Sequence, residues 1–154
     1  MGFFDGYNVS SSGMSAQRTR IDVVRANIAN AKTTHTAEGG PYKKQQVVFQ
    51  DILLANSNQK ANSNDVEATN DKNSDIALRG VGVKSIIQSD AKPVLRYDPT
   101  HPDANPEGYV AYPDINPVIE MVDLIEAMRS YEANVSAFNT HKAIDSKTIE
   151  ILNA

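Results

Sequence analysis

The stretch "NPVIEMVDLIEAMRSYEANVSAF", residues 116–138, decides the fold, because its apolar residues recur at alternating steps of three and four. That spacing is typical of a helix with a narrow apolar seam of the a/d type. Asn116 suits the N-cap, and Pro117 suits the first helical position, where no N–H is needed. The sequence predicts a C-terminal helix of about 30 residues or more within residues 114–154. Its seam comprises Met121, Leu124, Ile125, Met128, Tyr131, Val135 and Phe138.

The N-terminal segment, residues 1–33, has a second and weaker seam. Because Gly13 and the serine run at residues 10–12 disfavour helix, a firm helix is expected only beyond Gly13. The segment ends in "NIANA", where Asn27 and Asn30 lie beside the seam on the last turn and are expected in the helix–helix and subunit interface. Asn at such an end either binds the free backbone carbonyls or adopts the left-handed conformation that ends a helix. The apolar seam positions that we expect to pack against the C-terminal helix are Met14, Ile21, Val24, Ile28 and Ala31.

Between the helices, residues 34–113 change to the period of β-strands. Four short β-branched or aromatic runs, bounded by Gly, Pro and Asp, predict strands at Lys43–Gln50, Gly80–Gln88, Pro93–Asp98 and Gly108–Pro113. Residues 55–75 hold six Asn and one large aliphatic residue. Such a segment buries too little apolar surface to order itself, so a mobile polar loop is expected there.

The order of helix, β region and helix predicts how the two helices meet. If the β region is compact, its entry and exit lie close together, so the helices run side by side and antiparallel. The predicted fold class is therefore α+β, with an antiparallel coiled coil and a small inserted β region. In this arrangement Ala31 is expected level with Met121, and Met14 near the level of Val135–Phe138. Surplus apolar residues such as Val23 and Ile144 favour further helices from other molecules.

Composition and charge exclude several function classes. The 154 residues include no Cys, which removes disulfides and thiolate metal sites. No apolar run approaches the roughly 20 residues of a membrane span, and the first residues do not resemble a cleavable secretory signal. The net charge is −4, without the basic stripe that nucleic-acid binding requires. Three arginines near the N-terminus and an acidic C-terminal segment suit helices that meet.

One cluster carries residues of a kind used in catalysis. Asp98, His101 and Asp103 are able to chelate a divalent metal, so a metal-dependent hydrolase is a remote alternative. Three prolines within the same loop instead favour a rigid turn between two strands, which is the preferred interpretation. The sequence holds no set of nucleophile, base and orienting group. We therefore expect no enzyme activity, no catalytic or metal site and no cofactor.

Polar residues beside the C-terminal seam have two open interpretations. Arg129, Glu132 and Asn134 flank the seam within "RSYEANV". They either fix the register between helices of different subunits by polar pairing, or only keep the helix soluble.

Three stretches together resemble a known family. These are "NIANA" at residues 27–31, "EGGPYKKQQVVF" at residues 38–49, and "YDPTHPDANPEGYVAYPDINPVIEMVDLIEAMRSYEANVSAFNTHK" at residues 97–142. In this order they are similar to bacterial flagellar axial proteins, and more narrowly to one branch of the proximal rod proteins. With the rest of the N-terminal helix they cover well over half of the chain.

The resemblance implies a structural subunit of the basal-body rod that assembles through its terminal helices, transmits torque and lines the export channel. Its implied partners are copies of itself, other rod proteins and the flagellar export apparatus. The implied location is the periplasmic rod, reached without a cleaved signal peptide. A rival interpretation is a soluble helical scaffold that closes into a discrete dimer or a four-helix bundle.

Overall fold

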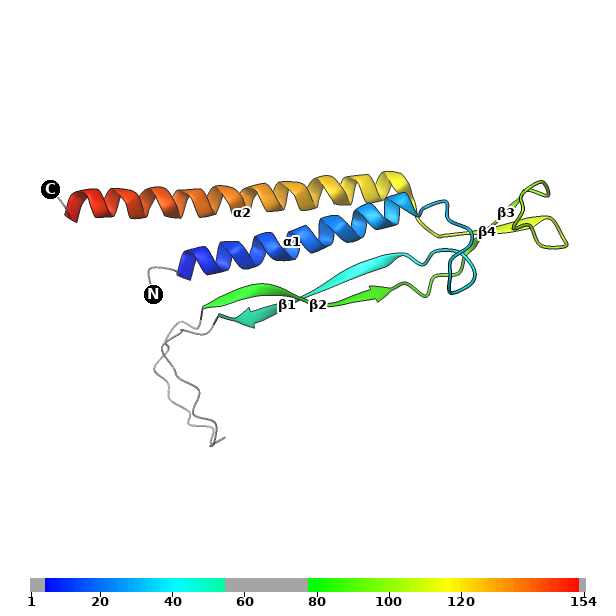
Figure 1. Ribbon diagram of the computed structural model, residues 1–154, viewed down its shortest axis with the longest axis horizontal. Helices are drawn as coiled ribbons and strands as arrows, with labels where there is room; N and C mark the ends of the chain where they lie inside the picture. Colours follow the sequence, from blue (N-terminus) through cyan, green and yellow to red (C-terminus); the bar gives the residue numbers. More distant parts are fainter. Residues whose placement is uncertain (1–4, 55–77, 153–154) are drawn as a thin grey trace, which may run out of the picture.

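The computed structural model describes residues 5–54 and 78–152 (Figure 1). Two long helices, α1 (Asp5–Ala29) and α2 (Pro117–Leu152), run antiparallel. Between them lie two separate antiparallel hairpins, which pair β1 (Gln45–Leu53) with β2 (Arg79–Gln88) and β3 (Val94–Tyr97) with β4 (Tyr109–Tyr112). The predicted α+β fold and the antiparallel helix pair are confirmed. The loop predicted at residues 55–75 lies outside the described residues.

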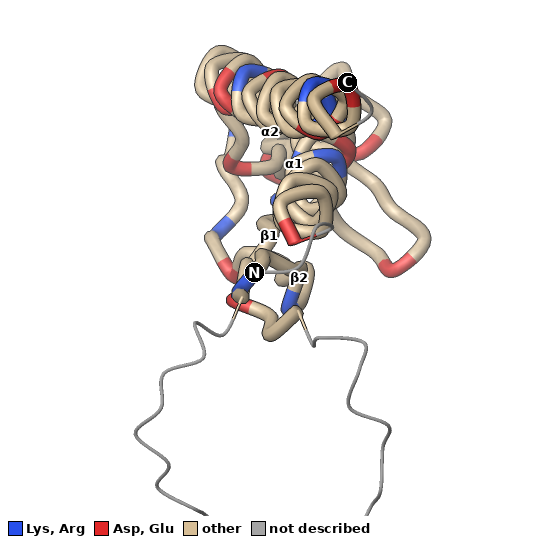
Figure 2. Tube along the Cα trace, turned by 90° about the vertical axis from the view of Figure 1, so that its left-hand side faces the viewer, with Lys and Arg blue, Asp and Glu red and all other residues tan. Residues whose placement is uncertain are grey.

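The chain is arranged in layers, with α1 in the middle. One side of α1 packs against α2, and another packs against the β1–β2 hairpin (Figures 1 and 2). The β3–β4 hairpin extends from the end where α1 finishes and α2 begins (Figure 1). Because α1 is covered on two sides, it supplies most of the buried apolar side chains in the described part of the chain. These are Ala16, Ile21, Val23 and Val24.

The expectation that α1 becomes firm only after Gly13 is wrong, because the helix begins at Asp5. Tertiary contacts outweigh the low helix propensity of its first turns. The Ser12 hydroxyl donates to the carbonyl of Val9 at 2.7 Å and accepts the N–H of Val81 in β2 at 3.2 Å. Tyr7 packs edge to face against Phe138 of α2, with ring centroids 4.9 Å apart.

The start of α2 and the end of α1 carry caps of the kind that the sequence predicts. Asn116 caps α2, since its side-chain oxygen accepts the N–H of Val118 at 3.0 Å and its carbonyl accepts that of Glu120 at 3.1 Å. At the end of α1, the side-chain amide of Asn30 donates to the carbonyl of Ala26 at 2.9 Å. The capping role predicted for Asn30 therefore matches its geometry.

The register of the helix pair differs from the expected one by roughly one turn near the start of α2, but it agrees with the expected level of Met14 and Val135 further along. Asn27, rather than Ala31, lies level with the start of α2, where it contacts Glu120. Further along, Gly13 faces Asn134 so closely that a Cβ on Gly13 would lie 2.7 Å from the Asn134 side-chain oxygen. The missing side chain of Gly13 lets a polar side chain of α2 lie in the seam, which an apolar a/d pattern does not reveal.

Gly13→Leu is expected to lower the free energy of unfolding by about 2 kcal/mol, because the larger side chain must displace Asn134 and separate the helices. Urea denaturation followed by circular dichroism measures this change. Gly6→Ala serves as a control, since its new Cβ meets the ring of His141, an exposed side chain that is able to move towards solvent. That control is expected to raise stability by up to about 1 kcal/mol through helix propensity. Equal stability of Gly13→Leu and the parent chain would contradict the need for close approach.

Candidate assembly interface

Asn27 is the centre of a buried polar junction that joins α1, β1 and α2. Its side chain is fully buried and makes four hydrogen bonds. The amide nitrogen donates to the Gln45 carbonyl at 2.8 Å and to Oε2 of Glu120 at 3.0 Å. The amide oxygen accepts the Gln45 N–H at 2.9 Å and the Tyr42 hydroxyl at 3.3 Å. Asn27 thus pairs with the backbone of β1 as a neighbouring strand would.

Glu120 completes the junction from the first turn of α2. Its carboxylate is buried and forms an ion pair with Lys44, whose Nζ lies 2.6 Å from Oε1. A buried carboxylate is tolerated when a cation and hydrogen-bond donors surround it, as here. The pKa of the Tyr42 hydroxyl is raised above its ordinary value, mainly by burial and also by the nearby negative charge of Glu120. The junction therefore fixes the start of α2 against both α1 and β1.

The sequence did not predict this junction. We predicted Asn27 in the helix–helix interface, at a helix end where its side chain would bind free carbonyls. The contact with Glu120 of α2 agrees with the interface position, but the structure buries Asn27 in the core instead of using it as a cap. The sequence feature that could have revealed the junction is a seven-residue spacing on α2. Glu120, Ala127 and Asn134 recur at this interval and all face α1, with Ala127 fully buried. A line of polar and small residues at heptad spacing is less conspicuous than the apolar seam beside it.

The predicted seam of α2 divides between two surfaces. Leu124, Tyr131, Val135 and Phe138 are half-buried. Met121, Ile125 and Met128 are instead 50%, 52% and 41% exposed, so in the single chain they lie outside the buried seam. The prediction placed these residues in packing both within and between subunits. Within one chain the positions of Glu120 and Ala127 face α1, and Met128 lies beside Ile21 at the edge of the helix pair, so packing of the three side chains between subunits stays a prediction.

The predicted residues of α1 mostly lie where the seam places them. Ile21, Val24 and Ala31 are buried, and Met14 and Ile28 are half-buried. The basic character of α1 also meets the acidic character of α2. Arg20 lies 3.9 Å from Asp123 and 3.7 Å from Glu126. Opposite charges therefore line one edge of the helix pair, as the charge distribution indicated.

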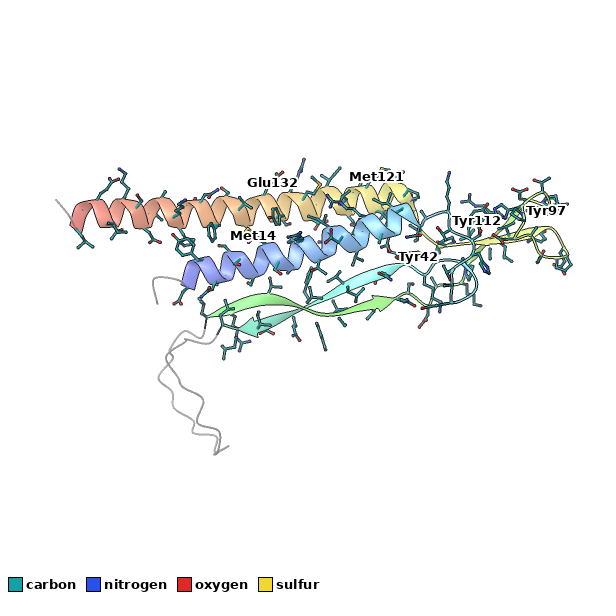
Figure 3. The ribbon with its side chains drawn as sticks, viewed as in Figure 1. Met14, Tyr42, Tyr97, Tyr112, Met121 and Glu132 are labelled. Atoms are coloured by element: carbon teal, nitrogen blue, oxygen red, sulfur yellow. The ribbon has the colours of Figure 1, made fainter. Side chains whose placement is uncertain are left out.

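The first three turns of α2 carry an exposed apolar surface, which we call the outer α2 face. In Figure 3 Met121 projects from the side of α2 that is turned away from α1. Contiguous apolar surface of this extent on a helix is typical of an interaction site. The outer α2 face comprises Val118, Met121, Val122 and Ile125, with Met128 at its border, where Met128 also lies beside Ile21 of α1.

The residues considered for a metal site serve a turn. Asp98 accepts hydrogen bonds from the Thr100 N–H at 3.2 Å and the Thr100 hydroxyl at 2.8 Å, which hold the pKa of its carboxyl below its ordinary value. Asp103 accepts from the Thr34 hydroxyl at 2.7 Å, and its N–H donates to Nδ1 of His101. Within residues 5–54 and 78–152, no three His, Cys, Asp or Glu side chains converge as a metal site would require.

Neither helix has a stretch that would allow it to cross a membrane, as judged over the described residues.

Two family models match the chain, one at each of its helices. "Flagella basal body rod protein" matches residues 8–34, which cover most of α1 and the turn after it. "Flagellar basal body rod FlgEFG protein C-terminal" matches residues 107–151, which cover β4 and nearly all of α2. The helical pair thus has the characteristics of the flagellar rod proteins, a class of structural proteins.

Proteins that are similar to nearly the whole chain specify the family within this class. The chain is 41% identical to the flagellar basal-body rod protein FlgC of Bacillus subtilis, with 96% of this chain and 97% of the relative covered. It is 39% identical to FlgC of Borreliella burgdorferi and 34% identical to FlgC of Salmonella typhimurium, with at least 98% of each chain covered. The chain belongs to the FlgC family of flagellar basal-body rod proteins.

The predicted resemblance is therefore confirmed, including its narrower branch. As a rod protein the chain is a component of the flagellar basal body, where it assembles with other flagellar components. The relatives that define its family are structural rod proteins.

Proposed function

We propose that the chain is a non-enzymatic subunit of the proximal rod, and that its terminal helices form the inner layer of a helical assembly. The observation that carries this proposal is the outer α2 face, which the chain's own helices and strands leave uncovered. Apolar area of this kind gains about 25 cal/mol per Å² when a neighbour removes it from water. A subunit whose longest helix has one face against α1 and another open to solvent is suited to packing between neighbours.

The proposal assigns a role to each part of the chain. Residues 1–33 and 114–154 form the axial layer, which lines the export channel and transmits torque from subunit to subunit. Residues 34–113 form the outer β region. The buried junction of Asn27, Lys44 and Glu120 supports torque transmission, because it holds the β1–β2 hairpin and both helices in one register.

The proposal also includes a route and a location. The chain is delivered through the flagellar export apparatus without removal of a leader, and it takes its place in the periplasmic part of the rod. Membership of the rod family and the resemblance of the helical ends to axial proteins support this route. The chain acts without a cofactor.

An image reconstruction of purified basal bodies at side-chain resolution tests the proposal. We expect density for α1 and α2 next to the central channel, the β3–β4 hairpin further from the axis, and the outer α2 face covered by neighbouring subunits. A discrete dimer with two-fold symmetry, in which the outer α2 faces of two copies cover each other, would contradict it.

A further inference from the structure

Two different grooves lie beside residues 122–133 of α2. The first, which we call the inter-helix groove, lies between α1 and α2 and has Ile21, Met128 and Tyr131 on its walls. The second, which we call the outer groove, runs along α2 alone and is lined by Val122 and Ile125. Both combine apolar side chains with charged ones, and both are open to solvent. Because the two grooves differ, a contact between the inter-helix groove of one copy and the outer groove of another would be heterologous. The copies at the two ends of such an assembly would each keep one groove free for a further copy.

Each groove carries a charged residue that has no ion partner within residues 5–54 and 78–152. Glu132 lines the inter-helix groove and Arg129 lines the outer groove. Neither forms an ion pair within the described parts of the chain, although they are three residues apart on α2. At the same spacing further along α2, Lys147 and Glu150 do pair, with Nζ 2.6 Å from Oε2.

The charges of the two grooves are complementary beyond this pair. The inter-helix groove has Arg18, Asp22 and Arg25 on its α1 side. Asp22 and Arg25 pair with each other at 3.7 Å, whereas Arg18 lacks an ion partner among the described residues. The outer groove has Glu126, whose contact with Arg20 is long at 3.7 Å and leaves the carboxylate largely exposed. Figure 3 shows Glu132 on α2 about midway along the length of α1. Complementary charges of this kind fix register and partner choice more than they add affinity.

We infer that the inter-helix groove of one copy receives the outer groove of a second copy, and that Glu132 of the first copy pairs with Arg129 of the second. The inference rests on the proposed function, since it names the partner for the outer α2 face. Ile125 and Val122 of one copy then cover Met128 and Tyr131 of the next. The same two surfaces repeat on every copy, so the contact propagates from subunit to subunit.

Charge reversal within one chain tests the pairing. Arg129→Glu and Glu132→Arg are introduced singly and together into a strain that lacks its own copy, and the amount in purified basal bodies is measured. Each single reversal places like charges opposite each other between copies and is expected to reduce incorporation by about tenfold. The double reversal restores opposite charges and is expected to return incorporation to the parent level.

The pair Lys147 and Glu150 provides the matched control. The same reversals there change an ion pair within one copy, with side chains 75% and 61% exposed. They are expected to leave incorporation unchanged. Circular dichroism of each purified variant shows whether the helices have formed.

The outcomes separate this inference from the proposed function. If the single reversals are incorporated as well as the parent chain, the pairing is wrong while the rod assignment stands. If the single and double reversals both fail, the groove meets a different protein, and a second copy is not its occupant. If the parent chain is absent from the rod, the proposed function itself fails.

Cysteine cross-linking adds a direct readout, because the chain contains no Cys. Arg18→Cys places a thiol in the inter-helix groove, and Ile125→Cys places one in the outer groove. In basal bodies assembled from both variants, oxidation is expected to yield a disulfide-linked dimer that neither variant gives alone. A dimer from one variant alone would show that like surfaces meet, and would overturn the inference.

Discussion

Asn27→Ala is expected to lower the free energy of unfolding by about 3 kcal/mol, a large share of the stability of a small domain. The substitution removes four hydrogen bonds at once. It also leaves the N–H and carbonyl of Gln45 without these partners in a partly buried place, and it takes a donor from the Glu120 carboxylate. Urea denaturation of the purified variant, followed by circular dichroism, measures the loss.

Asn30→Ala is the matched control, since it makes the same change three residues away in the same motif. Asn30 is only half-buried, and its amide nitrogen bonds to a carbonyl of its own helix at 2.9 Å. We expect a loss of about 0.5–1 kcal/mol for this variant. Equal losses at Asn27 and Asn30 would mean that Asn27 acts as a simple helix cap and that the junction contributes nothing.

Met128→Asp is expected to abolish incorporation into the rod while the chain itself still folds. Met128 is 41% exposed in the single chain, so a carboxylate there remains in contact with water. In the proposed assembly a neighbouring copy covers this position, and an unpaired buried carboxylate costs several kcal/mol. That cost corresponds to a loss of at least about a hundredfold in association. Motility and the amount in purified basal bodies are the measurements.

Asn139→Asp controls for the added negative charge. Asn139 is exposed on the same helix, and its conversion to Asp adds a carboxylate of equal size without removing apolar surface. We expect this variant to assemble and to support motility. If Met128→Asp also assembles normally, the outer α2 face is not an interface, and the proposed axial packing has to be revised.

Strand positions were predictable because local chemistry determines them. The run "VLRY" at residues 94–97 is rich in β-branched, aliphatic and aromatic residues, and a proline precedes it. The turn after it depends on prolines and on Asp98, whose oxygen accepts hydrogen bonds from Thr100 two residues along. Such conformational preferences act over a few residues, so a single sequence is enough to predict them.

The division of the α2 seam was not predictable in the same way. Met121, Met128 and Ile125 have the chemistry of a core, yet each is at least 41% exposed in the single chain. The periodic pattern reports how many apolar faces a helix has, but it does not say whether its own chain or a neighbour covers each face. Only the position of α1, with Gly13 against Asn134, shows which face is used within the chain.

By itself, the sequence determined that two long helices enclose short strands, where α2 begins, and the family to which the chain belongs. These properties depend on periodicity, capping and long identical stretches, which are all local along the chain. The tertiary structure alone decided the register of the helices and the role of Asn27. A side-chain amide satisfies its four hydrogen bonds only where groups from distant segments converge, and here Tyr42, Gln45 and Glu120 provide them.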